Sequence, residues 1–146
     1  MPSRVYIAND HAAVGLKNFL IKECPHLQWE NLGTDTEESV DYPDYAKLLA
    51  KKMTDDLQSV GVLICGSGQG MAIAANRFSH IRAALCWSAE VAKLAREHNN
   101  ANVLCLGSRL ITPQNALEIL KAFLETSFAG GRHERRVNKL NEKGQR

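Results

Sequence analysis

The hydrophobic residues of this 146-residue chain fall into five short runs that are separated by longer amphipathic or polar stretches. The run from Val60 to Ile64 is continuous and rich in β-branched residues, which is typical of a strand buried on both faces of a parallel sheet. Comparable runs predict further strands at residues 4–8, 28–32, 81–86 and 102–106.

Between these runs, apolar residues recur at the spacing of a helix face. Ala13, Leu16, Phe19 and Leu20 form such a stripe, and Val91, Leu94 and Ala95 are expected on the inner face of a later helix. A loop is expected from Glu97 to Ala101. The predicted helices each follow a strand or close the chain, and they span residues 12–23, 43–57, 71–76, 88–97, 113–129 and 132–140.

Strands that alternate with helices predict an α/β fold: a three-layer αβα, Rossmann-like open sheet of five parallel strands in a single domain of residues 1–146. Such sheets bind ligands at the carboxyl ends of their strands. Three polar groups fall at those ends, namely Asp10-His11, Cys65 with the glycines after it, and Arg109. We therefore expect these groups to converge on one site.

The most informative stretch is Cys65 with the loop Gly66-Ser67-Gly68-Gln69-Gly70 and the helix after it. Such a loop binds anions, because glycines let the backbone approach a ligand and the first N–H groups of a helix have no partner within it. The same N–H groups favour a thiolate, which would place a base beside an oxyanion hole. Taken alone, a cysteine at a strand end is more often an inert core residue. The glycine spacing fits neither a P-loop nor the dinucleotide fingerprint.

Composition excludes several classes of protein. No apolar run reaches the length of a membrane span and the N-terminus lacks a signal-peptide pattern, so we expect a cytoplasmic protein with no membrane partner. The four cysteines show no C-x-x-C spacing and are expected to be reduced. No cluster of His, Cys and carboxylates has metal-ligand spacing, so neither a metal nor a cofactor is predicted.

The charge is unevenly placed along the chain. From Arg132 onward, six Lys or Arg and two Glu give the tail +4, which leaves −2 for the rest of a chain whose net charge is +2. A basic tail can bind nucleic acid or the phosphate of a small molecule. Because the body lacks a basic surface, we expect no nucleic-acid partner.

Several candidates also have plainer structural explanations. Asp10 could serve only as a helix cap, and Arg109 could only cap carbonyl groups at a strand end. His98, at a helix end, is on its own more simply a solvated histidine. Arg132 and Arg136 lie four residues apart on one helix face, where they could clamp a phosphate or form a solvated surface.

Six segments together resemble the ribose-5-phosphate isomerase B family and its galactose-6-phosphate and allose-6-phosphate isomerase relatives. The segments are NDHA at 9–12, DYPDYA at 41–46, CGSGQGMAIAANR at 65–77, EHNNANVL at 97–104, LGSR at 106–109 and GGRHERRV at 130–137. They occur in order over nearly the whole chain. One branch of the family has a Glu base directly after the glycine loop. Met71 occupies that position here, which places the chain in the branch with a Cys base.

The resemblance implies a metal-independent aldose–ketose isomerase that interconverts ribose 5-phosphate and ribulose 5-phosphate through a cis-enediolate. Cys65 would move the proton between C2 and C1, with Ser67 assisting the glycine loop. His98 would open the sugar ring with help from Asp10. The implied substrate contacts are Asp10, Tyr42, Gly66, Ser67, Gly68, Gln69, Gly70 and Asn99, with His11, Arg109, Arg132 and Arg136 around the phosphate.

The resemblance also implies a homodimer or a dimer of dimers with its active site between subunits. Topology supports this independently, since Cys65 ends a strand and His98 ends a helix, which places them at opposite edges of one sheet. The alternatives are a six-carbon phosphate isomerase, a non-catalytic nucleotide-binding module and a nucleic-acid binder that works through the tail.

Overall fold

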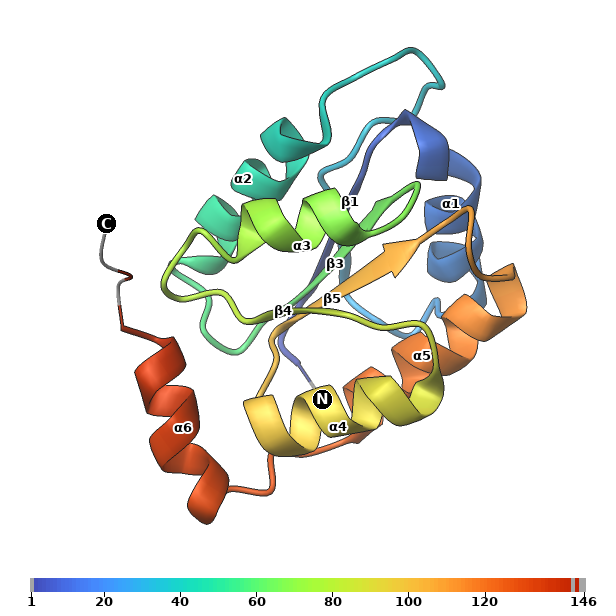
Figure 1. Cartoon of the computed structure of the whole chain (residues 1–146). Helices are drawn as coiled ribbons and strands as arrows, with labels where there is room; N and C mark the ends of the chain where they lie inside the picture. The colour runs from blue at the N-terminus through green and yellow to red at the C-terminus, as the bar shows by residue number, and fades with distance from the viewer. Residues whose placement is uncertain (1, 143, 145–146) are drawn as a thin grey trace.

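A five-stranded parallel sheet forms the centre of the protein, whose computed structural model describes residues 2–142 and 144 (Figure 1). The strand order is β2-β1-β3-β5-β4, and every neighbouring pair is parallel. The strands are β1 (Val5–Asn9), β2 (Trp29–Asn31), β3 (Val60–Cys65), β4 (Ala83–Leu85) and β5 (Val103–Gly107). The predicted α/β class with five parallel strands is confirmed.

Helices cover both faces of the sheet. They are α1 (Val14–Glu23, after a 3₁₀ turn at His11–Ala13), α2 (Tyr42–Met53), α3 (Gln69–Ala75), α4 (Ala89–Asn99), α5 (Pro113–Glu125) and α6 (Arg132–Leu140). One face carries α1, α4 and α5, the other carries α2 and α3, and α6 stands apart from the sheet beside the end of α4 (Figure 1). The side chains of Ser88 and Thr112 cap α4 and α5 by accepting from the N–H groups of Val91 and Asn115.

The alternation of side chains along the strands builds two apolar cores. Ile7, Val62 and Leu104 pack against α1, α4 and α5, while Leu63 and Cys105 pack against α2 and α3. Because both faces are covered, β3 is buried along nearly its whole length. This explains why its sequence reads as a continuous apolar run instead of an alternating one.

Several boundaries differ from the sequence predictions: α3 begins at Gln69 instead of Met71, β4 covers only Ala83–Leu85, and α4, α2 and α5 end elsewhere than expected. α4 continues through Glu97, His98 and Asn99, because the turn-forming residue is Asn100, which takes the left-handed conformation with φ 46°. Within α4, Ala92 is buried and Leu94 is 43% exposed, which reverses the expected role of Leu94.

Two further helices end earlier than predicted. α2 ends at Met53 instead of Leu57, and α5 ends at Glu125, well before the glycine pair at 130–131. After α5, Thr126 bonds back to the carbonyl of Ala122, and the chain crosses to α6 in an irregular stretch.

The strand order fixes where a ligand can bind. After β1 the chain forms β2 on one side of the sheet, and after β3 it forms β4 and β5 on the other side. The crevice between β1 and β3 is therefore the topological switch point. Asp10 follows β1 there, and its N–H donates to the carbonyl of Ile64 on β3 at 3.1 Å.

Among the described residues, no helix is long and apolar enough to cross a bilayer.

Candidate active site

A pocket of about 390 Å³ opens at the carboxyl ends of β1, β3 and β5. Its lining includes a thiol, a carboxylate, a guanidinium, a phenol ring and a hydroxyl group. The residues that line it are Asp10, Tyr42, Cys65, Gly66, Ser67, Gly70, Arg109 and Leu110. Seven of these eight residues are among those predicted from the sequence. Leu110 was not predicted, although its position directly after Arg109, just beyond β5, could have indicated it.

The Cys65 thiol lies at the floor of this pocket. It is 5% exposed, and the N–H of Gly68 donates to its sulfur at 3.2 Å. α3 begins at Gln69, so the positive end of that helix lies next to the sulfur. The N–H of Gly68 and the first turn of α3 therefore both face the sulfur atom.

The glycine loop allows two side chains to close over it. A Cβ on Gly66 would lie 2.9 Å from Nη1 of Arg109, so the guanidinium rests against the bare backbone. A Cβ on Gly70 would lie 2.4 Å from the Tyr42 ring. Side chains at either position would displace these walls, which gives the glycines a steric role in addition to anion binding.

The remaining polar groups of the pocket are held by local hydrogen bonds. Oδ1 of Asp10 accepts from the N–H of Ala12 at 3.0 Å, so the expected capping role is real, and the carboxylate also faces the pocket. Oγ of Ser67 accepts from the N–H of Gln69 at 3.3 Å. Ser108, beside Arg109, ties β5 to the 3₁₀ turn by donating to the carbonyl of Ala12 at 3.0 Å.

His11 does not line the pocket itself. Its Nδ1 accepts from the N–H of Val40 at 3.2 Å, which places the proton of the neutral ring on Nε2. The loop that carries Val40 is fixed further back by Lys17, which is fully buried and donates to the Thr34 carbonyl at 2.6 Å and to Asp35 at 2.5 Å. Lys17 was not foreseen, because a lysine on a helix is usually exposed.

The other predicted site residues lie elsewhere in the chain. His98 and Asn99 form the last turn of α4, and α6 carries Arg132 and Arg136. The ring of His98 stacks on that of His133, with centroids 4.4 Å apart and planes inclined by 15°. Burial, His98 and the two arginines together lower the pKa of His133 below its ordinary 6.5. This group therefore forms a second cluster, at the edge of the sheet opposite Cys65.

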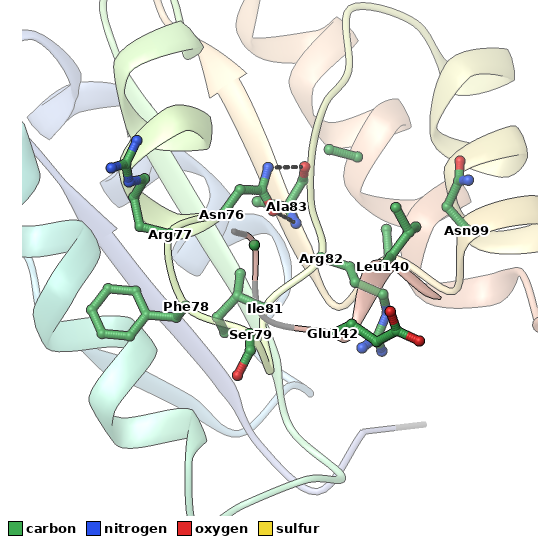
Figure 2. Close-up of a pocket in the computed structure, with 13 residues that line it drawn as sticks. Asn76, Arg77, Phe78, Ser79, Ile81, Arg82, Ala83, Asn99, Leu140 and Glu142 are labelled. Atoms are coloured by element: carbon green, nitrogen blue, oxygen red, sulfur yellow. Dashed lines mark hydrogen bonds between the residues drawn. The ribbon is translucent and has the colours of Figure 1, made fainter. Parts of the chain in front are cut away.

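A larger cavity, of about 570 Å³, lies beside this second cluster (Figure 2). Asn76 to Ile81 border one side of it, and Asn99 and Leu140 lie on the other. The described residues that line this cavity include no cysteine and no glycine loop. We therefore take the smaller pocket, where a thiol meets a glycine loop, as the candidate active site.

The other cysteines are placed as core residues. Burial raises the pKa of Cys86 to about 12, and it also raises the pKa of Cys105 and Cys24. All four thiols are free, as the sequence predicts for reduced cysteines. Among the residues that the structure describes, no three His, Cys, Asp or Glu side chains lie together as a metal-binding group.

The fold and the pocket are those of an α/β protein with a candidate active site at the switch point of its sheet, and residues 5–140 match the Ribose/Galactose Isomerase family, to which the chain belongs. It is 47% identical to a probable ribose-5-phosphate isomerase B of Mycoplasma pneumoniae over 93% of this chain and 91% of that protein.

Two solved structures support this assignment. The crystal structure of a ribose 5-phosphate isomerase from Thermotoga maritima has a TM-score of 0.92 and 48% identity, over 94% of this chain and 97% of that one. Ribose-5-phosphate isomerase B of Mycoplasma genitalium, solved with bound ribulose-5-phosphate, has a TM-score of 0.92 and 39% identity, over 97% and 96%.

Proposed function

We propose that this protein interconverts ribose 5-phosphate and ribulose 5-phosphate, with Cys65 as the base. The observation that carries the proposal is the Cys65 sulfur, which lies in the switch-point pocket within 3.2 Å of the Gly68 N–H. Family membership supplies the reaction class, and the Mycoplasma genitalium structure with ribulose-5-phosphate supplies the substrate class.

The chemistry follows from the groups in the pocket. The Cys65 thiolate takes the proton from C2 of the open aldose, and the electron pair moves toward the C1 oxygen to give a cis-enediolate. The loop Gly66–Gly70, assisted by Ser67, holds the enediolate oxygens and so stabilises the charge that develops there. Return of the proton to C1, together with transfer of the hydroxyl proton from O2 to O1, gives the ketose, with C2 oxidised and C1 reduced. Gln69 and Gly68 shape the loop at the start of α3.

The phosphate needs cationic partners at the far end of the substrate. Arg109 lies over Gly66 in the pocket, and we assign the Nε2–H of His11, the residue next to Asp10, as a second donor to the phosphate. Each charge-assisted hydrogen bond contributes about 1.5–3 kcal/mol, which can be used to orient the reacting carbons. Asp10 and Tyr42 complete the sugar site, where Asp10 is placed to assist ring opening.

The second cluster serves the active site of another subunit in this proposal. α4, with eleven residues, is about 16 Å long, so His98 cannot reach a sugar held by Cys65 of its own chain. A two-fold partner would bring His98, Asn99, Arg132 and Arg136 to that pocket. Leu140, which lines the larger cavity, is 56% exposed, and Ile73 on α3 is 65% exposed. Both apolar side chains are suited to burial in such a homodimer.

The function is tested by assaying ribose 5-phosphate isomerisation in EDTA, beside allose 6-phosphate and galactose 6-phosphate. We expect turnover of the five-carbon substrate without added metal. Preference for a six-carbon sugar would instead support the related isomerase activity. No turnover of any sugar phosphate, with nucleotide binding retained, would favour a non-catalytic module. The same proposal places the enzyme in the cytoplasm.

The shared site is tested by subunit mixing. Cys65→Ala and His98→Asn homodimers should each be nearly inactive on ribose 5-phosphate. When they are unfolded together and refolded one to one, half of the dimers are hybrids with one intact site, so about a quarter of the wild-type activity should return. Verified hybrids without recovered activity would show that both residues come from one chain.

A further inference from the structure

Two half-buried arginines converge on the residue that ends α4. Nε of Arg82 donates to the carbonyl of Asn100 at 2.8 Å, and Nη1 of Arg96 donates to the side-chain oxygen of Asn100 at 3.1 Å. Nη1 of Arg96 also donates to the carbonyl of Ala101. Asn100 is the left-handed residue that stops the helix, and it directly follows His98 and Asn99.

The same two side chains hold the path to α6. Nε of Arg96 donates to the carbonyl of Thr126 at 3.1 Å, at the start of the irregular stretch after α5. Nη1 of Arg82 donates to Asn141, just beyond α6, at 3.0 Å. Figure 2 shows Arg82 next to Leu140 and Glu142 at the end of that helix. The last turn of α4 and the far end of α6 are therefore fastened to one pair of guanidinium groups.

These arginines act through directed hydrogen bonds, since neither forms an ion pair within the described residues. Burial lowers the pKa of both guanidinium groups, and each stays an N–H donor. The ring of Phe123 lies below Arg96, with its centroid 5.7 Å from Cζ, and keeps the guanidinium plane in place. A lysine has the charge but not the planar fork, so it cannot serve these acceptors together.

We propose that Arg82 and Arg96 are positioning residues, which set the direction in which His98 and Asn99 leave α4 toward the partner's active site. The inference rests on the proposed function, because His98 must act in the neighbouring subunit. Neither arginine lines the Cys65 pocket, so a substitution should impair only the site that receives His98 from the altered chain.

Arg96→Lys removes the fork and should lower turnover of ribose 5-phosphate by about tenfold to a hundredfold, because small errors in placing a catalytic group are costly. Asn100→Gly is the milder companion. It keeps the left-handed turn but removes the side-chain acceptor of Arg96, and we expect a smaller loss. Arg4→Lys is the matched control, since Arg4 is exposed and pairs with Glu30 at 3.0 Å. It lies outside the Cys65 pocket and outside the second cluster.

Subunit mixing separates positioning from general damage. A hybrid of Arg96→Lys with Cys65→Ala holds one site with wild-type Cys65, His98 and Arg96, so mixing should restore about a quarter of wild-type activity. A hybrid of Arg96→Lys with His98→Asn holds no such site, so this mixture should show about half the activity of the Arg96→Lys homodimer. Asn100→Gly should follow the same pattern.

Each other outcome overturns the inference. Recovery with both partners would show that Arg96 does not act through His98. Recovery with His98→Asn alone would place Arg96 with Cys65. Recovery with neither, while Cys65→Ala and His98→Asn complement each other, would show that the substitution damages the fold of the whole chain. If Cys65→Ala and His98→Asn fail to complement, the shared site itself is wrong, and this inference fails with it.

Discussion

The N–H of Gly68 donates to the sulfur of Cys65 at 3.2 Å, three residues along the chain and at the start of α3. This contact joins the base of the proposed reaction to the loop that binds its anionic intermediate. The same stretch of backbone contacts the sulfur and is proposed to hold the enediolate oxygens. The two functions are therefore built by one strand–loop–helix unit.

Replacing Cys65 by Ala should reduce turnover by about a hundredfold to ten-thousandfold, which is the usual contribution of a general base. Solvent exchange of the C2 proton should disappear, while substrate still binds. Cys24→Ala is the control, because Cys24 is buried in the other core. Near-normal turnover of the Cys65 variant would refute the assignment.

Thiol modification should distinguish the four cysteines. Cys86, with a pKa of about 12, and the buried Cys24 and Cys105, whose pKa values are raised, stay protonated near neutral pH. Iodoacetamide should therefore modify Cys65 first, inactivation should follow that modification by mass spectrometry, and ribose 5-phosphate should protect. Loss of activity that tracks another cysteine would contradict this order.

Gly66→Ala should act through Arg109. The new Cβ would lie 2.9 Å from Nη1 of Arg109, and the flexible guanidinium should swing away from the phosphate. We expect the KM to rise about tenfold in Gly66→Ala and in Arg109→Ala, with the double variant no worse than Arg109→Ala alone. Effects that simply add would show that Gly66 and Arg109 act independently.

Arg136→Ala should raise the KM by about tenfold and weaken competitive inhibition by inorganic phosphate. Arg135→Ala removes the same charge from another face of α6 and should change both quantities far less. Equal effects of the two variants would indicate a general contribution of the basic helix rather than a phosphate clamp.

Asp35→Asn should lower the free energy of unfolding by about 1 kcal/mol, because it removes the negative charge that faces the buried Lys17 ammonium, while the amide oxygen can still accept a hydrogen bond. Hydrogen bonds from Lys17 and Asn31 hold the pKa of Asp35 below its ordinary 3.8. The stabilisation is therefore present above pH 3.8 and is lost as the pH falls through the folded-state pKa. Urea titrations at about pH 6 and about pH 3 should show the difference between wild type and variant shrinking, and Glu37→Gln, on the same loop, should show none.

The residue pattern alone is enough to predict the sheet and the polar residues that meet at its edge. Apolar runs such as 60–64 identify buried strands because a parallel sheet is covered on both faces, and topology then assigns polar residues after β1, β3 and β5 to one edge. This is why Asp10, Cys65 and Arg109, which are distant in sequence, could be expected in one pocket.

Other features depend on contacts between distant parts of the chain and become visible in the folded protein. α4 runs through His98 and Asn99 and stops at Asn100, whose carbonyl is held by Arg82 from a separate segment, a contact that no local pattern reveals. His11 turns toward Val40 instead of lining the pocket, and Lys17 is buried because a loop supplies its acceptors. Helical and strand periodicity report which face of an element is covered, whereas the length of a helix end and the partner of a buried polar group depend on residues far away in the chain.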